Sequence, residues 1–454
     1  MLLGRSSELN QLATYYGRKN SQIVVLYGQK YMGKTALLQE FMADKPGFYY
    51  TCEPVSEREQ RYRFGLFFAS LGIKTLKIPE YSDIFSCFAG KHSQKKVIVI
   101  DEFQNIIKTT PDFMDKLISF VHSSWNNQEF FIILCSSSVS FIENDMVSRI
   151  GEAAFELSGF IKLKELGFKE LREHFYLYTN DECAVVWAIL GGIPGLWNMF
   201  DDKISVKDNI IRNILDKSGP LHNVAKDLVN AELREPNVYN TILASLSCGI
   251  RKLNDLHEHT EFSRAKISVY IKTLMEFEFV TKVFSMDTDG RDNAKKGVYD
   301  ISHHFLDFYF TFVFNNSSFL DTHSPEEFYS MIVSPDLKTF TGKYFKDICM
   351  EYMRALNDRN RLPIKAERFG TWVGKQGTID IIATDSDGIN IVGVCVYDKP
   401  MVTYRDYEEL LDLSSKAEVK PDYVYLFSGS GFDEKINLES RIGKNLKPVL
   451  LDRI

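Results

Sequence analysis

The sequence predicts an α/β fold with a parallel sheet, and three apolar runs are the main evidence. They are "QIVVLY" at 22–27, "KKVIVIDEF" at 95–103 and "FFIILCSSS" at 130–138. Apolar runs without polar alternation are typical of strands buried on both faces of a parallel sheet. The first run leads through a glycine-containing segment into the helical pattern "ALLQEFMAD", as a strand–helix unit requires.

Length and composition indicate a soluble protein of several domains. The chain has 454 residues, enough for about two to four domains, with 44% hydrophobic and 25% charged residues. Its net charge of -7 provides no global positive field, so nucleic acid would need a local basic patch. The seven cysteines form no C-x-x-C pair, and there is neither a signal peptide nor a membrane-spanning run. We therefore expect a cytoplasmic protein with reduced thiols and no membrane partner.

Residues 28–35 match the pattern of a phosphate-binding loop between the first strand and the first helical segment. Its residues are Gly28, Gln29, Lys30, Tyr31, Met32, Gly33, Lys34 and Thr35. In such a loop the glycines let backbone N–H groups surround a phosphate, and the lysine contacts the terminal phosphates. The Thr35 hydroxyl would be a ligand of Mg²⁺. The loop therefore predicts ATP and Mg²⁺ as cofactors.

Two later strands add candidate catalytic residues. The run at 95–103 ends in Asp101 and Glu102, which places Asp101 to bind Mg²⁺ and Glu102 to activate the attacking water. The run at 130–138 ends in serines, where Ser136 or Ser137 would sense the terminal phosphate. An ordinary junction between a strand and a loop is the alternative for these serines.

Five segments in this order resemble the archaeal-type ATPases of the AAA+ and STAND-like group. They are "GRSSELNQL", the phosphate loop, "VIVIDEFQ", "LCSSSVSF" and "GGIPGLW", within residues 1–200. The resemblance implies a P-loop domain with a helical lid, in which "GGIPGLW" forms a turn. It also implies an arginine that acts on a neighbouring subunit, and hence a homo-oligomer. Arg149 is the candidate, although its Arg-Ile-Gly order departs from the family's Gly-Arg pair, and an ordinary solvated arginine is the alternative.

The middle of the chain predicts a winged helix-turn-helix. Residues 237–286 show three short amphipathic helices and a strand, and a polar turn then leads to a returning strand, "VYDIS". Ser263, Arg264, Lys266 and Lys272 are the residues placed to face a DNA groove. From Thr260 to Asp300, however, seven basic residues face seven acidic ones, whereas DNA-binding surfaces are basic. A rigid connector or protein-binding module is therefore the alternative to DNA contact.

The histidines of this region, His257, His259, His303 and His304, invite comparison with metal sites. No cysteine or carboxylate completes a ligand set at the usual spacing, so we interpret them as packing or surface residues.

The C-terminal part resembles the PD-(D/E)xK nuclease-like domain that ends proteins of the same family. A helix from near Thr341 precedes a hairpin, "GTIDIIATDSDGINIVGVCVYDKP", which is followed by a second helix and a strand. The nuclease requires an aspartate on the first hairpin strand and Glu-x-Lys on the second. Asp380 matches the aspartate, whereas Val394 and Val396 occupy the other two positions.

Two further positions decide whether this domain cuts DNA. The acidic residue that the family carries on the preceding helix corresponds here to Lys346. Asp398 is the remaining candidate for a second carboxylate. Because one carboxylate holds catalytic Mg²⁺ poorly, we predict a degenerate, non-cutting domain.

These observations together predict four domains: a P-loop core at 1–160, a helical lid at 161–225, a winged helix at 226–320 and a nuclease-like domain at 325–454. The predicted function is that of an ATP-hydrolysing switch, which controls the winged helix and the nuclease-like domain. Two alternatives are an ATP-dependent DNA nuclease and a nucleotide-gated protein-interaction switch in defence or regulation that does not bind DNA.

Overall fold

The computed structural model describes residues 3–88, 95–124, 128–233, 235–286, 297–374, 376–443 and 445–454. The chain forms two compact units. Unit 1 comprises residues 1–166 and 193–195, and unit 2 comprises residues 167–192 and 196–454. Within the described residues, no helix is long and apolar enough to cross a membrane.

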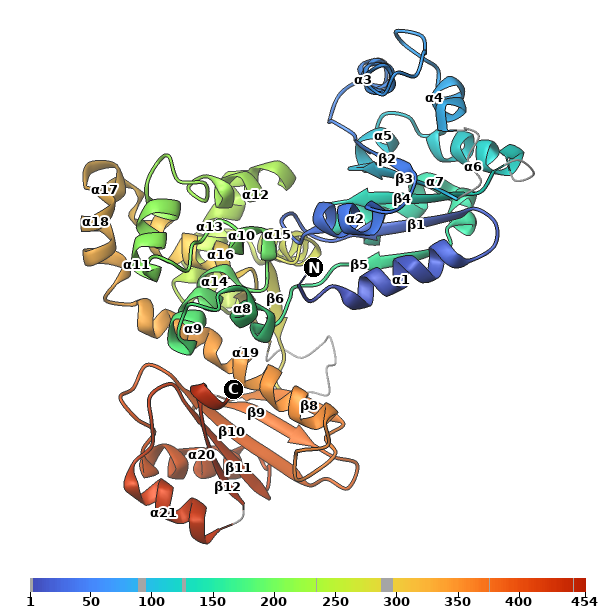
Figure 1. The fold of residues 1–454 in the computed structure, drawn as a ribbon. Helices are drawn as coiled ribbons and strands as arrows, with labels where there is room; N and C mark the ends of the chain where they lie inside the picture. The colour runs from blue at the N-terminus through green and yellow to red at the C-terminus, as the bar shows by residue number, and fades with distance from the viewer. Residues whose placement is uncertain are drawn as a thin grey trace. The chain divides into compact units, whose positions relative to one another are not determined.

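Unit 1 is built on a five-stranded parallel sheet in the order β2-β3-β4-β1-β5 (Figure 1). Its strands are β1 (Gln22–Tyr27), β2 (Gly47–Thr51), β3 (Lys96–Asp101), β4 (Phe130–Ser136) and β5 (Gly159–Lys162). The predicted α/β class is confirmed, since the three apolar runs form the three central strands. Every residue of β4 is buried, as a central parallel strand requires.

Helices cover this sheet and complete its core. They are α1 (Ser6–Gly17), α2 (Lys34–Met42), α3 (Glu57–Ser70), α4 (Tyr81–Phe88), α5 (Gln104–Ile107), α6 (Phe113–Ser124) and α7 (Met146–Ile150). Aromatic side chains of α3, α4 and α6 pack with strand residues in one buried cluster. Tyr50 and Phe64 stack within it at a ring-centroid distance of 3.7 Å.

Unit 2 begins with helices, and the chain returns briefly to unit 1 at residues 193–195. The helices are α8 (Phe168–His174), α9 (Asn180–Leu190), α11 (Val206–Asn209) and α12 (Val224–Glu232), and α10 (Pro194–Trp197) begins in the short segment of unit 1 and ends in unit 2. Next come α13 (Pro236–Ser247), α14 (Leu253–Thr260), α15 (Arg264–Glu276) and the antiparallel pair β6 (Val280–Val283) and β7 (Val298–Ile301). This order is the one expected of a winged helix, although most of the polar turn, 287–296, lies outside the described residues.

The C-terminal part of unit 2 holds a mixed sheet in the order β12-β11-β10-β9-β8. Its strands are β8 (Arg368–Val373), β9 (Thr378–Thr384), β10 (Asn390–Val396), β11 (Tyr423–Ser428) and β12 (Leu446–Leu450). The helices of this region are α16 (His304–Phe308), α17 (Ser317–Thr322), α18 (Pro325–Phe328), α19 (Leu337–Asp358), α20 (Tyr404–Lys416) and α21 (Glu434–Ile442). The helix expected near Thr341 begins earlier, at Leu337.

Candidate functional site

The predicted phosphate loop connects the end of β1 to the start of α2. Gly33 has φ 85° and Tyr31 has φ 68°, so the loop turns through the left-handed region twice. A side chain at Gly28 would place its Cβ 2.7 Å from the carbonyl oxygen of Leu163, which only glycine avoids. The loop therefore curls at the N-terminus of α2, where free N–H groups favour an anion.

Lys34 folds back over this loop. Its side chain is buried, and its Nζ donates hydrogen bonds to the carbonyl oxygens of Gly28 (2.7 Å) and Gln29 (2.8 Å). Burial lowers the pKa of Lys34, while the nearby Glu102 and Asp101 act in the opposite direction. No carboxylate pairs directly with the ammonium group among the described residues. A phosphate could thus replace two neutral carbonyls as its partner.

The two predicted metal ligands, Thr35 and Asp101, are brought together by a residue that the sequence did not suggest. The Tyr49 hydroxyl of β2 donates a short hydrogen bond to Asp101 Oδ2 and lies 3.4 Å from Thr35 Oγ1. Burial and the Asp101 carboxylate raise the pKa of Tyr49, so its hydroxyl stays protonated. Hydroxyl and carboxylate oxygens are hard ligands of the kind Mg²⁺ prefers, and this donor set fits the ion.

The Glu102 carboxylate is held in one orientation by three donors. Its Oε2 accepts hydrogen bonds from Gln104 Nε2 (2.5 Å), Ser137 Oγ (2.8 Å) and the Ser137 backbone N–H (3.3 Å). The φ of Glu102 is 52°, a strained value for a residue with a side chain. Its own N–H donates to Asp101 Oδ1 at 2.9 Å. The two predicted carboxylates are thus fixed side by side at the end of β3.

Ser137 and Ser136, the two candidate sensors, have different surroundings. Ser137 contacts Glu102, whereas Ser136 is fully buried and its Oγ accepts a hydrogen bond from the Ser138 N–H (3.1 Å). The Ser136 carbonyl accepts from the Gly28 N–H at 3.3 Å. Ser136 therefore supports the loop backbone, and Ser137 is the serine beside the candidate base.

Two further contacts support the loop from distant parts of unit 1. Arg5 is buried and donates from Nη2 to the Met32 carbonyl at 3.0 Å, while Nη1 pairs with Glu8. The Gly195 N–H donates to the Tyr31 carbonyl at 2.8 Å. A Cβ at Gly195 would lie 2.6 Å from that oxygen, so the contact requires glycine. Both residues belong to the segments "GRSSELNQL" and "GGIPGLW".

Arg149 is separate from this constellation. It is exposed on α7 and, among the described residues, forms no hydrogen bond or ion pair. Its action on a neighbouring subunit stays a prediction.

On the C-terminal hairpin, Val394 and Val396 occupy the positions of the nuclease Glu and Lys, and they pack with the apolar cluster that includes Leu410 of α20. The N–H of Cys395, which lies between them in the chain, donates to Asp380 Oδ2 at 2.9 Å. The thiol of Cys395 forms a hydrogen bond with that of Cys349 of α19. Cys395 thus lies beside Asp380 through its backbone N–H, and it supplies neither a carboxylate nor an ammonium group.

The sequence pattern did not indicate Asp347 as a second carboxylate near Asp380. Asp347 of α19 interacts electrostatically with Asp380, and so does Lys346, the residue assigned to the acidic position. Burial raises the pKa of Asp347 to about 6. Among the described residues, no group of three His, Cys, Asp or Glu side chains could hold a metal ion. His303 and His304 also have packing roles, since His303 caps α16 and His304 contacts the Trp187 carbonyl.

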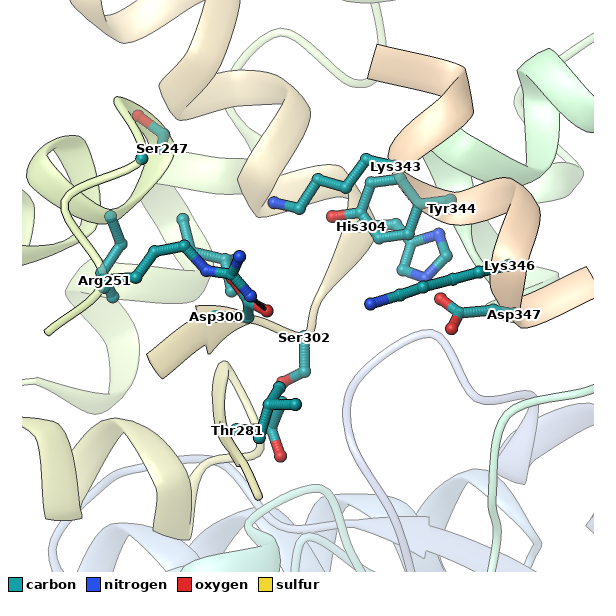
Figure 2. A pocket seen from close by; sticks show the side chains of 14 residues that line it. Ser247, Arg251, Thr281, Asp300, Ser302, His304, Lys343, Tyr344, Lys346 and Asp347 are labelled. Atoms are coloured by element: carbon teal, nitrogen blue, oxygen red, sulfur yellow. Dashed lines mark hydrogen bonds and ion pairs between the residues drawn. The ribbon is translucent and has the colours of Figure 1, made fainter. Parts of the chain in front are cut away.

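Lys346 and Asp347 line a cavity of about 420 Å³ within unit 2. Figure 2 shows the Lys343 and Lys346 side chains extending from α19 toward Arg251 and Asp300. Most of the positive charge that lines this cavity is paired with carboxylates, because Arg251 pairs with Asp300 and Lys343 pairs with Asp307.

Comparison with protein families identifies two regions of the chain. Residues 73–200 match the ATPase domain found predominantly in Archaea. Residues 309–406 match a family of archaeal and bacterial proteins of unknown function. The phosphate loop precedes the first matched range, so its assignment depends on the motif and the contacts above.

Individual relatives and solved structures are also similar to this chain. An uncharacterized protein of Methanocaldococcus jannaschii is 26% identical over 397 residues, covering 85% of each chain. The arsenical resistance operon repressor of Staphylococcus xylosus is 39% identical over 67 residues, 15% of this chain and 57% of the repressor. A Walker-type ATPase of Pyrococcus abyssi matches 68% of this chain and 96% of its own, at 15% identity and TM-score 0.46. The ORC2 protein of Aeropyrum pernix matches 72% and 94%, at 12% identity and TM-score 0.46.

Proposed function

We propose that the chain is an ATP-driven switch. The premise is that it carries an ATPase domain of the predominantly archaeal type and a second domain of an archaeal and bacterial family of unknown function. The observation that carries the proposal is the arrangement around the phosphate loop. Lys34 lies on the loop carbonyls, and Asp101 and Glu102 lie together at the end of β3.

Each residue has a distinct role in this proposal. Lys34 exchanges its two carbonyl partners for phosphate oxygens when ATP binds. Thr35 and Asp101 would hold Mg²⁺, which supplies charge neutralisation at the phosphates. Glu102, oriented by Ser137 and Gln104, accepts a proton from the attacking water.

The segment 193–195 would transmit a conformational change from the nucleotide site to unit 2. Gly195 hydrogen-bonds Tyr31 of the phosphate loop, and the chain enters unit 2 on both sides of this segment. A loop that rearranges around ATP would displace the Tyr31 carbonyl and, through its hydrogen bond, Gly195. The chain segments that connect to unit 2 at Gly192 and Leu196 would then move as well. The proposed output is the arrangement of the winged helix and the C-terminal domain, without DNA cleavage.

DNA binding by the winged helix is a second candidate function. Arg264, Lys266 and Lys272 are exposed on α15, and the similarity to a repressor favours this candidate. Neutralising Arg264 and Lys272 together should then abolish salt-dependent binding of duplex DNA. Unchanged binding, or none in the parent protein, would leave protein interaction as the output.

ATP binding and turnover by two variants test the proposal. Lys34→Ala should abolish ATP binding because it removes the cation that contacts the terminal phosphates. Glu102→Gln should retain binding but lower turnover by about 10²-fold or more, since only the proton acceptor is lost. Lys74→Ala, an exposed lysine of unit 1, is the matched control. Undiminished hydrolysis by both site variants would reject the assignment.

A further inference from the structure

Unit 2 contains a second charged cavity, of about 670 Å³, between α8–α9 and α19. Its walls are fixed to each other by Glu351 of α19, whose carboxylate accepts hydrogen bonds from the backbone N–H groups of Phe168 (2.8 Å) and Lys169 (3.4 Å). Gly167 permits this approach, because a Cβ there would lie 2.6 Å from Glu351 Oε1. Segments about 180 residues apart in the chain therefore form one built pocket.

Four arginines line this pocket without a carboxylate partner. Arg172 comes from α8, Arg359 and Arg361 follow α19, and Arg453 lies near the C-terminus. None of the four forms an ion pair among the described residues, whereas the fifth cation, Lys169, pairs with Glu173. The carboxylate of Glu351 is already engaged by backbone donors. The lining carries an excess of positive charge, because Lys169 and the four arginines outnumber Glu173 and Glu351.

The cavity of Figure 2 provides a contrast within the same unit. There, Arg251 and Lys343 each pair with an aspartate. Unpaired arginines that share one concave surface repel each other, and an anion bound among them would remove that repulsion. Guanidinium groups are also suited to phosphate, which they bind through two parallel hydrogen bonds.

Aromatic side chains lie in the same lining. Tyr176 is 75% exposed at this pocket, and Tyr352 of α19 lines it as well. Tyrosine rings stack on planar bases. A cavity of this size suits a small molecule, since such sites usually measure about 300–1,000 Å³.

We propose that this pocket binds a nucleotide with two or more phosphate groups, at a site separate from the phosphate loop. The arginines would bind the phosphates and a tyrosine would stack on the base. Because the pocket joins α8 and α9 to α19, its ligand would stabilise the contact between these helices. The proposal does not depend on hydrolysis at the loop.

Calorimetric titration of the full chain with ATP and with ADP tests the proposal, in a Lys34→Ala background that silences the loop. We expect binding that weakens at least tenfold in Arg359→Gln/Arg361→Gln and, separately, in Arg172→Gln. Arg405→Gln, an exposed arginine of α20, is the matched control and should bind as its parent does. Unchanged thermal unfolding midpoints would show that the variants are folded.

Three results would overturn the proposal. They are no nucleotide binding in the Lys34→Ala background, equal affinity in all arginine variants, and binding of a single-stranded oligonucleotide without binding of ATP or ADP. The last result would assign the arginines to a nucleic-acid surface. Failure of the ATPase proposal is distinguishable, because it appears as undiminished turnover in Lys34→Ala and Glu102→Gln.

Discussion

At the scale of single residues, Tyr49 most changes the picture of the nucleotide site. Its hydroxyl contacts both residues that were assigned to Mg²⁺, Thr35 and Asp101. It donates a hydrogen bond to a carboxylate that is buried at the end of β3. Binding of the ion must therefore compete with this hydrogen bond or rearrange it.

Tyr49→Phe tests this competition. Removing the hydroxyl frees Asp101 Oδ2 while retaining the ring, so we expect half-maximal ATP turnover at a Mg²⁺ concentration several-fold lower than in the parent. The measurement is turnover against free Mg²⁺ at saturating ATP. Tyr62→Phe, on α3, is the control. An unchanged or higher Mg²⁺ requirement would contradict the competition.

The motif residues could be predicted from the sequence, and the contacts that support them could not. The phosphate loop and Asp101-Glu102 follow from local patterns, since each lies at the end of an apolar run. Arg5, Tyr49 and Ser137 act through contacts between residues far apart in the chain. The sequence "GFYYT" at 47–51 reads as an ordinary strand, and nothing in it distinguishes Tyr49 from Tyr50.

At the scale of elements, β9 of the C-terminal hairpin departs from strict alternation of its side chains. Ile379 and Ile382 lie three residues apart but pack in the same apolar cluster. Strict alternation would place them on opposite faces, so the period of two is broken between them. The break turns Asp380 toward Cys395 and α19. The strands were predictable from composition, whereas this local irregularity was not.

The start of α16 provides a test of stability against pH. Burial lowers the pKa of His303 to about 4 and that of His304 to about 3, from an ordinary value of 6.5. As pH falls below 6.5, the unfolded chain binds protons that the folded chain does not, so the free energy of unfolding decreases. In His304→Asn, the free energy of unfolding should decrease less steeply between about pH 6 and 4. The difference in slope from the parent should be about 1.4 kcal/mol per pH unit.

Urea unfolding of both proteins at several pH values measures this difference. Asp347, whose pKa burial raises to about 6, contributes with the opposite sign because its folded form binds the proton more tightly. Its contribution is common to both proteins and cancels in the comparison. Equal pH slopes for the parent and His304→Asn would contradict the buried neutral histidine.

At the scale of the whole molecule, we expect no DNA cleavage. Asp347 interacts electrostatically with Asp380, but among the described residues no group of three His, Cys, Asp or Glu side chains could hold a metal ion. Supercoiled plasmid should therefore remain intact with Mg²⁺ or Mn²⁺ and ATP. Nicking that is lost in Asp380→Ala and kept in Asp387→Ala, an exposed turn residue, would restore the nuclease alternative.

The central claim is that the nucleotide controls the position of unit 2, and energy transfer between the units measures it most directly. One dye on Cys248, which is exposed in unit 2, and another on Asn10→Cys in α1 of unit 1 report the separation. In the Glu102→Gln background, the account predicts different transfer efficiencies with ATP and with ADP. It also predicts that Lys34→Ala abolishes the difference. Equal efficiencies with ATP, ADP and no nucleotide, in a protein that binds ATP, would contradict the switch.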